Sequence, residues 1–144
     1  MAAIREITAF LGMDQPSDRQ KSPLYLIRLI EKGLPTSVLD RVSSSVAPSD
    51  ASFKYRLVKK ATLARRYKRR QRLSAEESGR LARLIRTWSL ALDVWASDSE
   101  ARDFMFRTHQ LLEGRRPIDL VIGSDPGARM VEDILGRLQY GSAV

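Results

Sequence analysis

The stretch Ser74-Ala75-Glu76-Glu77, continued by SGRLARLIRTWSLALDVW to residue 95, contains the clearest helix signal in this chain of 144 residues. Its first four residues form a capping box, in which the serine oxygen accepts a hydrogen bond from a backbone N–H and Glu77 reaches back to the cap residue. The large apolar residues that follow recur on one helical face for about six turns. We therefore predict a long central helix against which the others pack, with an inward face of Leu81, Leu84, Ile85, Trp88, Ala91, Leu92 and Trp95.

Helix start and stop signals recur on both sides of this stretch. Upstream, Ser22-Pro23 predicts the start of an apolar helix that ends at Gly33, and we expect this helix to be buried. Downstream, Asp98 begins another helix, and Pro117 and Pro126 each fit the first turn of a shorter one. Shorter helices are expected at residues 4–11, 35–43, 50–55 and 59–72. Because no alternating strand pattern occurs, the predicted fold class is all-α.

The net charge of +8 is concentrated in one segment. Residues 1–50 carry six basic and six acidic groups, residues 51–72 carry ten basic and no acidic groups, and residues 73–144 carry nine basic and eleven acidic groups. No acidic residue in the basic segment can form ion pairs along the helix surface, so the like charges repel one another unless a polyanion is present. This localised excess favours a nucleic-acid contact over general alkalinity.

A second informative stretch lies at the C-terminal end. It contains Gly114-Arg115-Arg116-Pro117-Ile118-Asp119-Leu120, then Gly127-Ala128-Arg129, Leu135-Gly136-Arg137 and Tyr140-Gly141. Apolar stripes flank a break at residues 123–127, and so short a segment can bury only a small core by itself. Arginine is enriched in interface hot spots, so these arginines indicate a partner.

This C-terminal stretch resembles the toxin-binding domain of the MbcA/ParS/Xre antitoxins, whose pattern is roughly G-[RT]-[RT]-P-[IL]-[DE]-L, G-A-x-x-V, L-G-R and a terminal Y/H-G. Upstream, Thr62-Leu63-Ala64-Arg65-Arg66 is similar to a signature of the same family. The resemblance implies a bacterial antitoxin of a type II toxin–antitoxin system that neutralises a RES-type, NAD-degrading toxin. It also implies that the protein represses its own operon.

On this resemblance we expect an N-terminal helix or arm at residues 1–21, a helix-turn-helix-like DNA-binding and dimerisation domain at 22–97, and a small helical toxin-binding domain at 98–144. A homodimer is expected because a helix-turn-helix reads paired half-sites. Its leading contact is the apolar surface between Ile4 and Leu34. The predicted turn Tyr55-Arg56-Leu57-Val58 lacks glycine, so we expect a longer or distorted turn.

Two sets of residues are the candidate contacts. Most of the first set should contact phosphates, with two or three residues reaching base edges. The second set is expected to cover or plug the active site of the toxin. The operator DNA contacts are Lys59, Lys60, Thr62, Arg65, Arg66, Arg69 and Arg70, and the toxin contacts are Arg115, Arg116, Arg129, Arg137, Tyr140 and Gly141.

Other functions are less well supported. No convergent set of titratable groups predicts an enzyme, and neither a metal site nor a cofactor is predicted; the single histidine, His109, is expected in a linker. The absence of cysteine excludes disulfides, and without a long apolar run or signal peptide we expect a soluble, cytoplasmic protein. The main alternative is a stand-alone helix-turn-helix regulator whose C-terminal domain senses a ligand or oligomerises. RNA binding remains open on charge alone.

Overall fold

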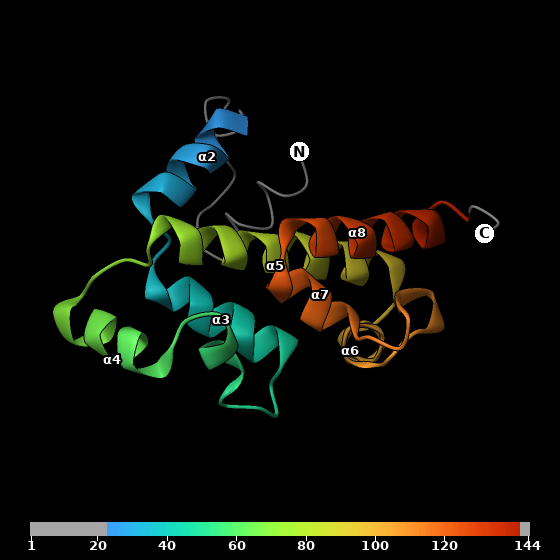
Figure 1. Cartoon of the computed structure of the whole chain (residues 1–144), viewed down its shortest axis with the longest axis horizontal. Helices are drawn as coiled ribbons and strands as arrows, with labels where there is room; N and C mark the ends of the chain where they lie inside the picture. The colour runs from blue at the N-terminus through green and yellow to red at the C-terminus, as the bar shows by residue number, and fades with distance from the viewer. Residues whose placement is uncertain (1–22, 142–144) are drawn as a thin grey trace. The chain divides into compact units, whose positions relative to one another are not determined.

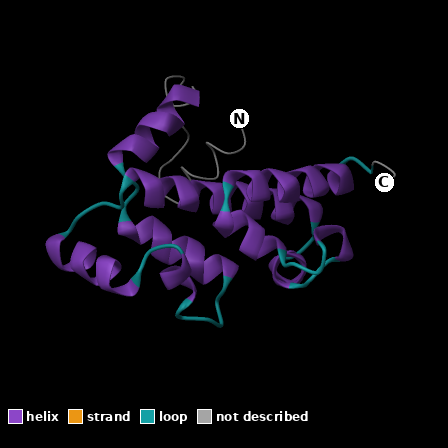
Figure 2. Ribbon diagram, viewed as in Figure 1, coloured by secondary structure: helices purple, strands orange, loops and turns teal. Residues whose placement is uncertain are grey.

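The computed structural model describes residues 23–141 and confirms the all-α fold class. Seven α-helices and two short 3-10 helices are joined by loops, and no strand occurs in this range (Figures 1 and 2). A single isolated bridge pairs His109 with Arg115. The predicted helix at residues 4–11, the predicted cap Ser22 and the apolar residues of the N-terminal arm lie outside the described residues.

The described residues divide into two compact units, 23–85 and 86–141. The division falls inside α5 (Ala75–Val94), the predicted long central helix, so one continuous helix contributes to both units. The boundary predicted near Ser97 instead follows the end of this helix. The sequence pattern shows where a helix ends. The division into compact units depends instead on which residues each half of that helix contacts.

In the N-terminal unit, α2 (Pro23–Lys32) ends at Gly33, as predicted. Gly33 has φ +99°, and a Cβ there would lie 2.2 Å from the carbonyl oxygen of Leu73, so glycine is required on two counts. The expectation that this helix is buried was wrong. Leu24 is 55% exposed and Ile27 50% exposed, because the helix is apolar around more of its circumference than its unit covers.

The helix α3 (Thr36–Val46) supplies the core of this unit with Val38, Leu39 and Val42, all fully buried. It is followed by the 3-10 helix η2 (Phe53–Arg56), the basic helix α4 (Lys60–Arg69) and the first half of α5. The α5 start is the predicted capping box: the Ser74 backbone N–H donates to Glu77 Oε1 at 2.8 Å, and the Glu77 N–H donates to Ser74 Oγ at 3.1 Å.

The C-terminal unit contains the second half of α5, then α6 (Asp98–Phe106), the 3-10 helix η3 (Gln110–Leu112), α7 (Pro117–Gly123) and α8 (Asp125–Gln139). Both predicted proline starts are confirmed. Ser124 caps α8 by accepting a hydrogen bond from the Gly127 N–H at 3.0 Å. Gly127 also permits a close helix contact, since a Cβ there would lie 2.2 Å from the carbonyl oxygen of Leu120. The core residues of α7 and α8 are Ile118, Val121, Ala128, Val131 and Leu135.

Aromatic side chains pack in this unit as expected. Trp88 is 1% exposed, and the ring of Trp95 lies 6.0 Å from that of Phe104. The ring of His109 lies 5.0 Å from the same phenylalanine, and its Nε2 is 2.9 Å from the Phe104 carbonyl oxygen. His109 thus organises the connection between α6 and α7.

Candidate functional sites

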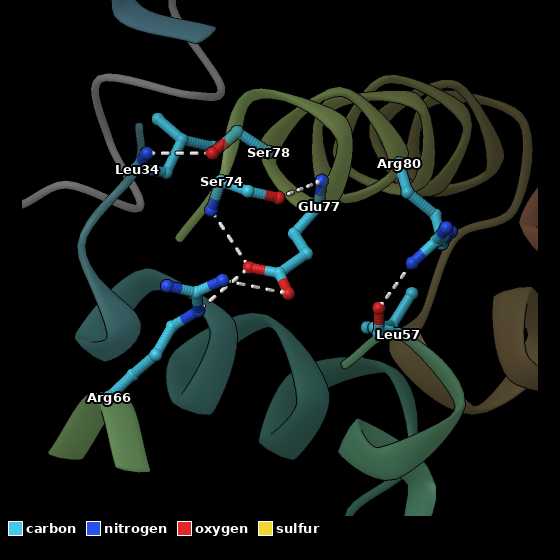
Figure 3. A network of polar contacts seen from close by, with 7 residues as sticks. All are labelled: Leu34, Leu57, Arg66, Ser74, Glu77, Ser78 and Arg80. Carbon is cyan, nitrogen blue, oxygen red and sulfur yellow. Dashed lines mark hydrogen bonds and ion pairs between the residues drawn. The ribbon is translucent and has the colours of Figure 1, made fainter. Parts of the chain in front are cut away.

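The basic helix α4 follows a short, ordinary turn. Residues 57–59 connect η2 to α4, and none of them has positive φ, so the turn needs no glycine. Leu57 and Val58 are buried in the turn, and Arg80 of α5 donates from Nη1 to the Leu57 carbonyl oxygen at 2.6 Å (Figure 3). The longer turn that we expected is therefore corrected: Tyr55 and Arg56 belong to η2, which replaces the predicted short helix from residue 50.

One apolar anchor attaches α4 to its unit. Leu63 is fully buried and is the only residue of this helix that is. The opposite side consists of exposed residues at helical spacing, Lys60, Ala61, Ala64, Arg65, Lys68 and Arg69. At about 100° per residue these six positions occupy one continuous half of the helix surface. The cationic side chains therefore form a single face.

Arg66, a predicted DNA contact, is directed into the unit instead (Figure 3). Its Nε lies 2.9 Å from Glu77 Oε1, its Nη2 donates to Glu77 Oε2 at 3.3 Å, and its side chain is only 16% exposed. Burial by itself raises the pKa of Glu77, but the Ser74 N–H and the Arg66 guanidinium outweigh it and lower the pKa below the ordinary value of 4.5. The Glu77 carboxylate thus connects the capping box of α5 to the basic helix.

A second polar contact lies on the other side of Leu63. The Tyr67 hydroxyl donates a short hydrogen bond to Asp40 Oδ1 of α3, and Lys54 Nζ lies 3.4 Å from both groups. Burial, and then the hydrogen bond to Asp40, raise the pKa of Tyr67. The ammonium of Lys54 also lies 5.4 Å from the centre of the Tyr67 ring. Lys54 is therefore engaged within its own unit.

The remaining predicted DNA contacts divide by exposure. Thr62 is half-buried, while Lys59, Lys60, Arg65, Arg69 and Arg70 are exposed. Arg70 closes the helix in the left-handed region with φ 53°. Lys68 was missed as a candidate, although its spacing of four and eight residues from Ala64 and Lys60 places it on the exposed face.

The C-terminal unit presents a different surface, which we call the α8 groove. It is a hollow of about 460 Å³ lined by Leu111, Pro126, Arg129, Met130, Asp133, Ile134 and Arg137. Leu111 is 72% exposed and Met130 51% exposed, whereas Val131, the next residue along α8, is buried. A second hollow, of about 470 Å³, shares Leu111, Pro126 and Met130 with the first and extends to Arg115.

The predicted toxin contacts are brought together in part. Arg129 and Arg137 line the α8 groove and Arg115 lines the adjoining hollow. Arg116 instead forms a two-pronged ion pair with Asp119, with both N–O distances 2.9 Å. This pair raises the pKa of Arg116. Beyond the helix, Tyr140 is 82% exposed and Gly141 has φ +64°.

Two further features of the described residues bear on the class of site. Among residues 23–141, no group of three or more His, Cys, Asp and Glu side chains is placed to hold a metal ion. None of the helices that the structure describes is long and apolar enough to cross a membrane.

Known families match both parts of the chain. Residues 26–86 match the antitoxin Xre-like helix-turn-helix domain, and residues 90–141 match the antitoxin Xre/MbcA/ParS C-terminal toxin-binding domain. The chain is similar to the antitoxin Xre of Yersinia enterocolitica, with 27% identity over 117 residues, 81% of this chain and 79% of that protein. It is similar also to the antitoxin Xre of Photorhabdus laumondii, with 24% identity over 119 residues, 81% of this chain and 80% of that protein. Since antitoxin domain models match both residues 26–86 and residues 90–141, the chain belongs to the Xre/MbcA/ParS family of antitoxins.

Proposed function

We propose that this antitoxin neutralises a RES-type, NAD-degrading toxin by binding over its active site through the α8 groove. The observation that carries the proposal is the combination of exposed Leu111 and Met130 with Arg129 and Arg137 at one hollow. Exposed apolar side chains beside arginines are the usual composition of an interface core and its edge. The match of residues 90–141 to a toxin-binding domain supports the same assignment.

Within this surface the side chains have different tasks. Burial of Leu111 and Met130 against the toxin supplies the association free energy, since apolar area removed from water is stabilising. Arg129 and Arg137 pair with carboxylates of the toxin through their planar guanidinium groups. Tyr140 and Gly141 extend beyond the groove toward the active site. Arg116 keeps its partner Asp119 and shapes the start of α7.

The test is co-expression with the protein encoded in the adjacent reading frame, followed by cell survival and NAD measurements. The double variant Arg129→Glu, Arg137→Glu should fail to protect, because two attractive contacts become repulsive. Arg107→Glu is the control for the effect of one charge reversal, since Arg107 is exposed in the same unit and does not line the groove. Full protection by the double variant would refute the groove as the binding surface. An adjacent protein that neither kills cells nor lowers NAD would favour the stand-alone regulator.

We propose further that the N-terminal unit binds the operator of its own operon as a homodimer and represses it. The exposed cationic face of α4 supports DNA binding, and the order η2, turn, α4 is that of a helix-turn-helix whose second helix enters the major groove. Leu24 and Ile27, one turn apart on α2 and half exposed, support a contact between copies on this helix. Sedimentation of the full chain should give a dimer, and Ile27→Asp should give a monomer with weaker operator binding.

A further inference from the structure

The first turns of α5 hold three separate segments of the N-terminal unit in place. Ser78 Oγ accepts a hydrogen bond from the Leu34 N–H at 2.8 Å, and Arg80 holds the turn before α4. Glu77 binds Arg66 of α4 itself (Figure 3). All three α5 side chains lie within one and a half turns of the capping box. Two of these α5 side chains, Glu77 and Arg80, therefore hold α4 and the turn before it.

The two polar contacts of α4 lie on either side of its apolar anchor. At about 100° per residue, Arg66 and Tyr67 flank Leu63, one on each side. A single buried leucine holds a helix at the surface but does not by itself prevent it from rolling about its axis. The Arg66–Glu77 pair on one side and the Tyr67–Asp40 hydrogen bond on the other prevent rolling in both directions.

We propose that Glu77 is a positioning residue of the DNA interface, which acts through Arg66 to set the rotation of α4 so that Lys60, Ala64 and Arg65 face the base edges. This inference rests on the proposed DNA binding and adds what determines its specificity. Phosphates can be reached by flexible lysines and arginines from many helix rotations, whereas base edges must be met at a defined angle. Loss of the pair should therefore reduce discrimination between sequences more than total affinity.

The exposed face also indicates what α4 reads. Among the residues proposed to face the base edges, Arg65 suits the two major-groove acceptors of guanine, and the methyl group of Ala64 suits the methyl group of thymine. Arg65→Ala should relax the preference for guanine at one position by about fivefold or more.

The experiment compares Glu77→Gln with Glu76→Gln in the full chain. Both substitutions remove one negative charge from the same helical turn, so they change the general attraction to DNA equally. Glutamine is accepted at the last position of a capping box, so Glu77→Gln retains the cap while removing the charge that binds Arg66. The Glu76 side chain is 86% exposed, so its 3.4 Å ion pair with Arg80 is screened by solvent, and its loss should leave the 2.6 Å hydrogen bond from Arg80 to Leu57 in place.

The measurement is the ratio of affinities for two duplexes, one taken from directly upstream of this reading frame and one with the same bases shuffled. Glu77→Gln should lower this ratio about tenfold, on the scale of one base contact, while Glu76→Gln leaves it unchanged. Equal ratios in the two variants would overturn the positioning role and leave DNA binding intact. A wild-type protein that binds both duplexes equally would instead overturn the proposed operator binding.

A double-mutant cycle tests whether Glu77 acts through Arg66. In an Arg66→Gln background, Glu77→Gln should cause no further loss of discrimination, because the contact is already absent. A second loss of the same size would contradict this route. If thermal unfolding shows that Glu77→Gln does not fold, Arg66→Gln tests the same contact from α4 with the same expected tenfold loss.

Discussion

The exposed cationic face of α4, called the α4 face below, and the α8 groove are two candidate binding surfaces of different composition. The α4 face is cationic, and its exposed uncharged members are only alanines. The α8 groove combines large exposed apolar side chains with arginines at its edge. The first composition suits the regular anionic backbone of DNA, while the second suits a protein surface with its own apolar core. The comparison shows that arginine content alone does not distinguish the two kinds of partner.

The largest expected difference between the two surfaces is their response to salt. If six or more phosphates are neutralised at the α4 face, affinity for the upstream duplex should fall about a thousandfold between 50 mM and 200 mM salt. Toxin affinity should fall less than about tenfold, because apolar burial is not screened. Titrations of both complexes in the same buffers give the slope of log affinity against log salt concentration for each surface. Equal slopes would remove the distinction between the surfaces.

The next effect concerns the close contact that supports the α8 groove. Gly127→Ala should destabilise the C-terminal unit by about 2 to 3 kcal/mol, because the new Cβ would lie 2.2 Å from the Leu120 carbonyl oxygen. Gly136→Ala is the control within α8, where nothing lies within 4 Å of the added methyl group. It should stabilise by about 0.5 to 1 kcal/mol. Denaturant unfolding measures both changes, and the same sign for both would show that the Gly127 contact is not a constraint.

A smaller effect separates arginines that the sequence alone treats as equivalent. Arg116→Ala should reduce stability by no more than about 1 kcal/mol, since its pair with Asp119 is more than one-third exposed on each side, and should leave toxin affinity nearly unchanged. Arg137→Ala should lower toxin affinity about tenfold or more with little change in stability. Calorimetry of binding and of unfolding on the two variants decides the assignment. A loss of toxin affinity in Arg116→Ala, with none in Arg137→Ala, would instead identify Arg116 as a toxin contact.

The smallest effect is the pH dependence of the contact beneath the α4 face. The pKa of Glu77 is lower in the folded protein than its ordinary value of 4.5, so the stability that Glu77 contributes is present above about pH 4.5 and is lost as the pH falls through the folded value. The stability difference between wild type and Glu77→Gln should therefore narrow on acidification. The control Glu76→Gln should follow the wild type in thermal unfolding at each pH. A stability difference between wild type and Glu77→Gln that stays constant with pH would show that Glu77 is not ionised in this contact.

Much of the fold was predictable because it depends on local chemistry. The capping box at Ser74, the stop at Gly33 and the starts at Pro117 and Pro126 act within one helical turn, and each was found where the sequence placed it. The burial of α2 was not predictable, since an apolar helix has the same pattern whether its own unit or a partner covers it. The shape of the turn before α4 also depended on contacts made by Arg80, which is distant in sequence.

The candidate surfaces were predictable in location and less so in membership. Ten basic residues with no acidic neighbour identify the region of α4, but they do not tell which side chain turns inward. Arg66 finds its carboxylate eleven residues away on α5, and Arg116 finds one three residues away on α7. Met130 and Val131 are adjacent in sequence, yet only Val131 is buried.

The sequence by itself determined the all-α architecture, the helix starts at Ser74, Pro117 and Pro126, the stop at Gly33, the segregation of charge and the family, because these follow from periodicity, caps and linked motifs within short stretches. The tertiary structure alone decided which charges are already engaged and which remain exposed for a partner. The physical reason is that an ion pair such as Arg66–Glu77 depends on the packing of two helices, which no local pattern specifies. Helix packing thus separates the charged residues that position α4, such as Arg66, from those that remain exposed and available to contact DNA.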